Sequence, residues 1–272
     1  MIGKLYGIGV GPGEAELLTL KALRIMRESD VIIVPGTDVE KSVAYQIVLP
    51  VFPEITEKTR VAVKMPMTKD PVRLEESHQK AAEVIEIFLR EGKQVAFLTL
   101  GDVTIYSTYL YVHHRVAEAG YPVEIVNGIP SFCAVAARLN MGLVEKSEML
   151  HIIPASYQIE EALKLPGTKV LMKAGKQMGH VKELLKQADA TAVMIENCGM
   201  PGEKIYSTID EIPEDAGYYS LIIVKEKNGI MIHFGRAGSG AKDLITVRGT
   251  AAAWRSGYYY LCRIPSQSGV AG

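Results

Sequence analysis

The stretch LYGIGVGPGEAELLTLKA at residues 5–22 leads from a short apolar run through four glycines into an amphipathic pattern. An apolar strand, a tight glycine loop and a helix in this order are typical of proteins in which parallel strands alternate with crossover helices. The same pattern returns as IHFGRAGSGAKDLITVRG at residues 232–249, aligned without a gap. The sequence therefore predicts one α/β module followed by the beginning of a second.

Outward from this stretch, short apolar runs alternate with longer helical patterns, which predicts an α/β fold. We expect two α/β domains, at residues 1–119 and 120–229, with the passage between them in the turn-rich stretch Glu118–Glu124. The expected strands are Lys4–Gly9, Val31–Val34, Val61–Lys64, Gln94–Leu98, Val123–Val126, Leu150–Ile153, Lys169–Met172, Ala192–Glu196 and Tyr219–Lys225. The expected helices are Glu14–Glu28, Pro71–Glu91, Tyr106–Ala119, Ser131–Leu139 and Met178–Gln187.

The segment after Gly249 differs from the rest of the chain, because it lacks periodicity and contains the one tryptophan, Trp254. Synonymous codons for residues 256–272, read from the second base, allow ADIIIYAGSLVNPALL, whose start aligns with Ser29–Gly36 of the first module. We interpret residues 230–272 as the stub of a second module, altered by a one-base shift; a natural irregular tail is the alternative. We expect this stub to be poorly packed, because it is too short to bury a core.

The composition is that of an ordinary soluble enzyme, with 48% hydrophobic and 22% charged residues. A net charge of −1 argues against a nucleic-acid partner. The three cysteines have no ligand spacing, which favours cytosolic thiols over disulfides or a zinc site. No apolar stretch approaches the ~18 residues of a membrane span, and a secretion signal is not apparent. We therefore expect a cytoplasmic protein without a membrane or metal partner.

The glycine loop Gly7–Gly13 lies between an expected strand and an expected helix, where backbone N–H groups can hold a phosphate. The dinucleotide pattern G-x-G-x-x-G nevertheless fails in every frame, and no Walker lysine follows. Glu14 and Glu16 would also repel a pyrophosphate at the helix start. The alternatives are therefore a ligand cradle of another kind and a tight turn without a ligand.

Two later motifs follow expected strands, at the edge where open parallel sheets bind ligands. The first is TLGDVTIYST at residues 99–108, in which Asp102 could contact a ligand or cap a helix that opens near Thr104. The second is GIPSFCAVAARL at residues 128–139, whose small residues permit close approach of a flat ligand or simply tight helix packing.

In order and spacing, these segments resemble the tetrapyrrole methylase family, S-adenosylmethionine-dependent enzymes of corrin and sirohaem synthesis. Within it, the chain is most similar to the branch that methylates carbon 20 of precorrin-2 or cobalt-factor II, and the stub resembles the start of the branch that methylates carbon 11 of precorrin-4. The resemblance covers residues 1 to about 228. Its blocks are the glycine loop with SDVIIVPG at 29–36, PMTKD at 66–70, the two motifs above and MPGEKIY at 200–206.

This resemblance implies two α/β domains, a homodimer, and the methyl donor bound in the cleft between the domains. The chain departs from the family pattern at Val103 and Asn127, where prolines are usual and whose absence should loosen the loops, and at Cys198, where a small residue is common. The methyl-donor contacts that the resemblance implies are Pro12, Leu100, Gly101, Asp102, Ile105, Pro130, Ser131, Met172 and Cys198.

Methyl transfer from a sulfonium to an electron-rich carbon needs no metal, so positioning can supply much of the catalysis. A base could remove the proton from carbon 20, but the sequence does not identify a catalytic residue; His113, Tyr106 and Asp102 are within reach. Because the acceptor carries many carboxylates, basic groups should line its site. The candidates for acceptor contacts are Lys64, Lys69 and Tyr106, with Lys173 and Lys176 as further lysines; solvated surface positions are the alternative.

Two other classes of protein use a similar sheet. A nicotinamide or flavin oxidoreductase would need the missing third glycine and an acid after the second strand, where Val34-Pro35-Gly36 stands. A non-catalytic binding module could keep the same cleft, and turnover of the methyl donor would distinguish it from an enzyme.

Overall fold

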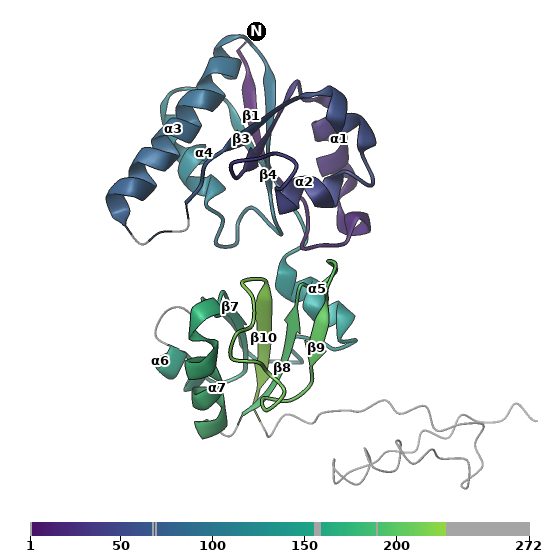
Figure 1. Ribbon diagram of the computed structural model, residues 1–272, viewed down its shortest axis with the longest axis vertical. Coiled ribbons are helices and arrows are strands. Elements are labelled where there is room, and N and C mark those ends of the chain that lie inside the picture. Colours follow the sequence, from purple (N-terminus) through teal and green to yellow (C-terminus); the bar gives the residue numbers. More distant parts are fainter. Residues whose placement is uncertain (1, 67, 69, 155–158, 189, 227–272) are drawn as a thin grey trace, which may run out of the picture. The chain divides into compact units, whose positions relative to one another are not determined.

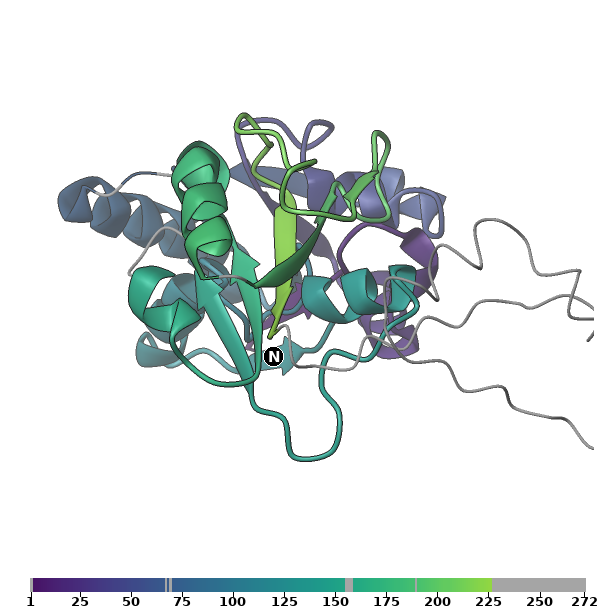
Figure 2. The ribbon, with the colours of Figure 1, turned by 90° about the horizontal axis from the view of Figure 1, so that it is seen from below.

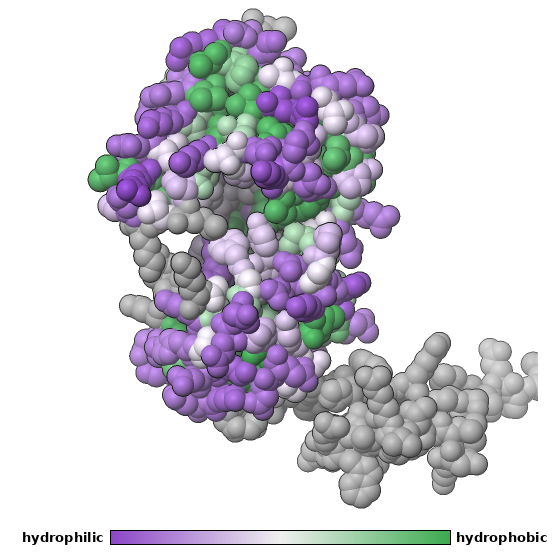
Figure 3. Space-filling view, in the orientation of Figure 1, coloured by the Kyte–Doolittle hydropathy of each residue, from purple (hydrophilic) through white to green (hydrophobic). Residues whose placement is uncertain are grey.

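The computed structural model describes residues 2–66, 68, 70–154, 159–188 and 190–226 (Figure 1). The stub expected at residues 230–272 and the candidate Lys69 lie outside the described residues. Two five-stranded sheets carry helices on their faces, which confirms the α/β fold. In this part of the chain, no helix is long and apolar enough to cross a membrane. Figure 3 shows a mainly hydrophilic surface on the face in view, with small apolar areas.

The first sheet is parallel throughout and has the strand order β3-β2-β4-β1-β5. All five strands were expected from the sequence, and their ends differ by at most two residues. The ligand-binding edge of such a sheet is the one where the strands end. The strands are β1 (Lys4–Gly9), β2 (Val31–Pro35), β3 (Thr59–Val63), β4 (Gln94–Thr99) and β5 (Val123–Val126).

Helices cover both faces of this sheet because alternate strand side chains point to opposite faces. In β2, Ile32 and Val34 pack in one core cluster with α1 and α2, whereas Val31 and Ile33 pack in another with α3 and α4. The single helix expected at Glu14–Glu28 is split, and the side chain of Thr19 caps the second part. The helices are η1 (Ala15–Leu17), α1 (Leu20–Glu28), α2 (Val43–Val48), η2 (Pro53–Glu57), α3 (Pro71–Arg90) and α4 (Tyr109–Glu118).

The second sheet is mixed, with the order β6-β7-β10-β8-β9. Its one parallel pair among the described strands is β6 with β7, whereas β10 is antiparallel to both neighbours and β9 forms an antiparallel pair with β8. The sequence pattern, which is typical of parallel strands joined by helices, did not indicate these antiparallel pairs, because apolar runs do not encode strand direction. The strands are β6 (Leu150–Pro154), β7 (Thr168–Met172), β8 (Thr191–Glu196), β9 (Lys204–Tyr206) and β10 (Ser220–Lys225).

The helices of the second sheet also divide between its two faces, as Figure 2 shows for α7 and α5. Alternate residues of β10 separate accordingly: Ile222 and Val224 join the cluster of α6 and α7, and Leu221 and Ile223 join that of α5. The helices are α5 (Ser131–Arg138), α6 (Ile159–Leu163), η3 (Gly175–Gln177) and α7 (Met178–Gln187).

The passage between the sheets lies further along the chain than the expected boundary at residues 119 and 120. β5 pairs with β1 inside the first sheet, and α5 is the first element that packs on the second. Glu118–Glu124 is instead the turn from α4 into β5, in which Gly120 has a φ of +87°. A turn signal marks a change of direction, and it does not say whether the next strand joins a new sheet.

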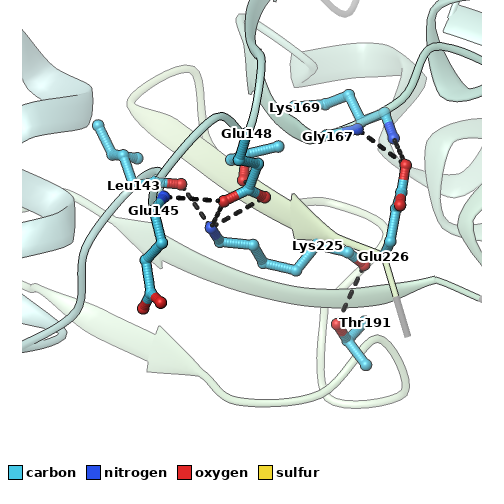
Figure 4. A network of polar contacts seen from close by, with 9 residues as sticks. Leu143, Glu145, Glu148, Gly167, Lys169, Thr191, Lys225 and Glu226 are labelled. Atoms are coloured by element: carbon cyan, nitrogen blue, oxygen red, sulfur yellow. Dashed lines mark hydrogen bonds and ion pairs between the residues drawn. The ribbon is translucent and has the colours of Figure 1, made fainter. Parts of the chain in front are cut away.

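A polar network fixes the end of β10, the last described strand (Figure 4). The Lys225 ammonium lies 3.0 Å from a Glu148 carboxylate oxygen and also donates to the Leu143 carbonyl. The neighbouring Glu226 accepts a hydrogen bond of 2.8 Å from the Gly167 backbone and lies 3.6 Å from the Lys169 ammonium. These contacts tie β10 to the segments that lead into β6 and β7.

Candidate functional site

Three loops meet where the neighbouring strands β4, β1 and β5 end. The glycine loop after β1 and the loop after β4 form an isolated antiparallel bridge between Gly11 and Gly101. Its two backbone hydrogen bonds measure 3.1 and 2.8 Å, and Val10 donates a further one to the Thr99 carbonyl at 2.9 Å. The first two motifs of the sequence are thus joined directly.

The glycines in these loops allow backbone to pack on backbone. A Cβ atom at Gly128 would lie 2.2 Å from the Gly101 carbonyl oxygen, and one at Gly9 would lie 2.5 Å from the Gly128 nitrogen. Neither distance is compatible with a side chain. Gly9, in the loop that fails to match a dinucleotide pattern, therefore serves a contact between loops, as does Gly128 in the loop after β5.

Asp102 joins two of these loops, the one after β4 and the one after β5. Its side chain is 5% exposed, and its Oδ1 accepts hydrogen bonds from the Thr104 backbone at 2.8 Å and from the Thr104 hydroxyl. Its Oδ2 accepts from the Gly128 backbone at 2.9 Å and from the Asn127 amide at 3.2 Å. Burial raises the pKa of this carboxyl, but the hydrogen bonds outweigh burial and hold the pKa below its usual range.

The helix-cap interpretation of Asp102 is wrong, because α4 begins at Tyr109 and not near Thr104. A contact between Asp102 and a ligand stays a prediction, but its carboxylate already accepts four hydrogen bonds from the protein. Sequence reasoning missed this role, because nothing in the motif indicated that Asn127 and Gly128 would lie beside it.

At both departures from the family pattern, the residue that replaces proline makes contacts that hold its loop. Val103 is fully buried in a core cluster of the first sheet. Asn127 donates its side-chain amide to Asp102, and its backbone carbonyl accepts from the Thr19 hydroxyl at 3.4 Å. Each residue therefore replaces the rigidity of a proline with a side-chain anchor.

The glycine loop also reaches the second sheet. A Cβ atom at Gly13 would lie 2.4 Å from the Cys198 carbonyl oxygen, so this glycine permits contact with the loop after β8. Burial, with a smaller contribution from Glu203, raises the pKa of the Cys198 thiol to about 11, so the thiol is protonated at neutral pH. The Glu203 carboxylate holds this loop by accepting from the Gly199 backbone at 2.8 Å and from Arg138 at 2.7 Å.

Three of the expected methyl-donor contacts share one apolar cluster. Ile105 comes from the loop after β4, Met172 ends β7 and Cys198 follows β8, yet all three pack on the cluster that contains Phe132 of α5. The remaining expected contacts lie in the three loops or at the start of α5: Pro12, Leu100, Gly101, Asp102, Pro130 and Ser131. The fold thus gathers loops that are far apart in the sequence.

The residues considered for acceptor binding or as a base are more dispersed. Lys64 is exposed and lines a hollow of about 410 Å³ between β3 and α3, which Arg73 and Lys80 also line. No residue of the loops after β1, β4 and β5 lines this hollow. His113 lies on α4 with its Nδ1 3.1 Å from the Tyr109 hydroxyl, and burial lowers its pKa. Tyr106 is exposed, and its hydroxyl donates to the Ile152 carbonyl at 2.9 Å.

A comparison with known protein families shows to which family this chain belongs. The family Tetrapyrrole (Corrin/Porphyrin) Methylases matches residues 4–213, which is more than half of the chain. The chain belongs to this family, and the resemblance found in the sequence is confirmed.

Individual relatives agree over nearly their full lengths. The chain is 37% identical to the probable cobalt-precorrin-2 C(20)-methyltransferase of Methanocaldococcus jannaschii, over 83% of this chain and 97% of that protein. It is 33% identical to the cobalt-precorrin-2 C(20)-methyltransferase of Salmonella typhimurium, over 84% and 98%. A solved structure, uroporphyrin-III C-methyl transferase from Thermus thermophilus complexed with S-adenyl homocysteine, matches with a TM-score of 0.63 and 20% identity, over 82% and 98%. At that identity the structural match supports the fold alone.

Proposed function

We propose that this protein transfers the methyl group of S-adenosylmethionine to carbon 20 of precorrin-2 or of cobalt-factor II, in cobalamin biosynthesis. The observation that carries the proposal is the 37% identity to a probable cobalt-precorrin-2 C(20)-methyltransferase across 97% of that relative. Membership of the tetrapyrrole methylases supports the reaction class. The second C(20)-methyltransferase relative, at 33% identity, supports the position that is methylated.

The residues present fit S-adenosylmethionine. The cluster of Ile105, Met172 and Cys198 offers an apolar wall, and the loops of Pro12 and Gly101 bring backbone groups to the strand ends. The titratable thiol in this set is neutral, so it adds no charge beside a sulfonium. When bound, the cofactor supplies an activated methyl group. We therefore propose that the nine residues expected from the sequence contact the methyl donor.

The chain's own contribution is to position the reactants. The bridge between Gly11 and Gly101, together with the Asp102 hydrogen bonds, fixes the loops before any ligand arrives. Holding the two reactants in an attacking geometry can contribute roughly 7–11 kcal/mol to catalysis. We propose that the apolar side chains of this cluster help to keep water from the reacting atoms.

We further propose that Lys64, Lys69 and Tyr106 contact the acceptor and that the protein works as a cytoplasmic homodimer. The anionic acceptor favours basic neighbours. The homodimer follows from the family resemblance, and light scattering on the purified protein tests it: a monomer at micromolar concentration would overturn it.

The decisive experiment supplies precorrin-2, with and without inserted cobalt, together with S-adenosylmethionine. We expect one added methyl group by mass, located at carbon 20 by NMR, and faster turnover of one of the two acceptors. Calorimetry should separately detect binding of the methyl donor. A methyl group at another carbon, or no transfer to either acceptor despite binding of the methyl donor, would overturn the proposed position.

A further inference from the structure

Lys173 and Tyr106 lie in segments that follow strands of different sheets, and they contact each other. Lys173 follows β7 directly after Met172, and Tyr106 follows Ile105 in the loop after β4. Both non-glycine residues adopt left-handed backbone conformations, with φ of +60° and +49°. Such conformations cost about 1–3 kcal/mol each and persist only where surrounding contacts enforce them, often at functional sites.

The contacts between the two residues position the lysine closely. The Lys173 ammonium donates to the Tyr106 carbonyl at 3.1 Å and lies 5.7 Å from the centre of the Tyr106 ring. The Tyr106 hydroxyl in turn donates to the Ile152 carbonyl in β6. The ammonium is therefore held against the loop that the family resemblance assigns to the methyl donor.

The surroundings of the Lys173 charge differ from those of Lys169 and Lys225, two lysines of the second sheet. The ammonium groups of Lys169 and Lys225 lie 3.6 and 3.0 Å from the carboxylates of Glu226 and Glu148. Among the residues that the structure describes, no carboxylate lies within ion-pair distance of Lys173. Its side chain is half-buried, and burial lowers its pKa. A partly desolvated cation without an anion is costly, and a ligand carboxylate would reduce that cost.

The chemistry of the two proposed substrates decides which of them this ammonium serves. The methyl donor has a single carboxylate, but its own ammonium and sulfonium leave it a net cation, which an ammonium repels. The tetrapyrrole acceptor carries several carboxylates and is a net anion, which an ammonium attracts. We infer that Lys173 binds a carboxylate of the acceptor and so sets its position beside the methyl donor; this inference rests on the proposed function. In addition to its proposed contact with the acceptor, Tyr106 holds the Lys173 ammonium through its backbone carbonyl.

The left-handed backbone of Lys173 allows a test that separates binding from stability. Lys173→Gly removes the ammonium and also relieves the backbone strain, so the variant should melt at the same temperature as the wild type or a few degrees higher. Lys146 is the matched control, because it is an exposed lysine with a φ of +50°. Lys146→Gly should have the same effect on melting and none on ligand binding.

Binding is measured by fluorescence titration with precorrin-2 under anaerobic conditions and by calorimetry with S-adenosylmethionine. We expect Lys173→Gly to weaken acceptor binding by about tenfold or more and to change the affinity for the methyl donor by less than about twofold. In turnover, KM for the acceptor should rise more than kcat falls. Lys173→Arg should restore most of the acceptor affinity, because it keeps the charge.

The outcomes separate this inference from the proposed function. Normal acceptor affinity in Lys173→Gly, with methylation at carbon 20 by the wild type, would overturn the role of Lys173 alone. Weakened acceptor binding in the variant, with methylation at a different carbon, would support Lys173 and overturn the proposed position. A wild type that binds no tetrapyrrole would overturn both.

Discussion

At the scale of single residues, Asp102 shows how a residue in a recognisable motif can carry a structural role that the motif does not reveal. The family pattern assigns it to the methyl donor, whereas its buried carboxylate joins the loops after β4 and β5. A residue type and its place after a strand can be read from the sequence. Its partners on another loop cannot, because they depend on how distant segments pack.

This role of Asp102 predicts a loss of stability even without ligand. Asp102→Asn replaces one accepting oxygen with an amide that faces protein donors, and we expect the free energy of unfolding to fall by about 2 kcal/mol in urea. Asp38→Asn is the control, because Asp38 is more exposed and accepts one backbone hydrogen bond, from Glu40. That variant should lose under about 0.5 kcal/mol. If both variants lost the same free energy of unfolding, the hydrogen bonds of Asp102 would stabilise the protein no more than that of the exposed Asp38.

At the scale of elements, the loops at the strand ends depend on close backbone contact. Gly128→Ala would place a methyl group 2.2 Å from the Gly101 carbonyl oxygen. We expect this change to cost about 3 kcal/mol or more and to weaken binding of the methyl donor. Gly142→Ala meets its nearest atom, the Val144 carbonyl oxygen, at an ordinary 3.6 Å, and should stay within about 0.5 kcal/mol of the wild type. Thermal and urea unfolding of both variants tests the contact between Gly128 and Gly101. If the two variants were equally stable, this contact would not be needed for the fold.

The packing of α3 on α4 predicts a dependence of stability on pH. His78 in α3 is 5% exposed and stacks on Tyr111 of α4, with ring centres 4.6 Å apart. Burial first, and then the charge of Arg115, lowers its pKa from 6.5. As the pH falls below 6.5, the unfolded chain binds a proton that the folded protein does not, so stability falls until His78 is protonated in the folded state.

Replacement of His78 should weaken this dependence. Urea midpoints at about pH 8 and about pH 5.5 should differ less in His78→Phe than in the wild type, because the buried ring no longer titrates. Part of the difference should remain, since the pKa of His113 is lowered by burial in the same way. A difference as large as that of the wild type would assign the effect to other groups.

How closely the sequence predicts a helix or strand depends on how long and how strongly apolar its residue pattern is. All strands of the first sheet, and the helices α3 and α7, are long or strongly apolar, and the sequence predicts them closely. The short α2 and β9 were missed, because six and three residues carry little periodicity. The mixed direction of the second sheet was also missed, since it results from connections and packing and not from residue type.

At the scale of the whole molecule, β10 completes the second sheet of the described module. This strand lies inside the second sheet between β7 and β8, and its faces fill both core clusters. The ion pairs of Lys225 and Glu226 fix its end. The family match and the relatives concern this module, whereas the interpretation of residues 230–272 as an altered second module stays a prediction outside the described residues.

Because β10 completes the second sheet, we can predict where the chain can be shortened. A protein that ends at Gly229 keeps β10 and its polar network, so we expect its melting temperature to stay within about 3 °C of the full chain and its methyl transfer and oligomeric state to be unchanged. A protein that ends at Val224 loses Lys225 and Glu226, which leaves the half-buried Glu148 carboxylate without its cation, and should melt well below the first. Melting, light scattering and methyl transfer of the two truncations test this boundary. A marked loss in the longer truncation would show that the segment after Gly229 is an integral part of the enzyme, and the interpretation as the stub of another module would fall.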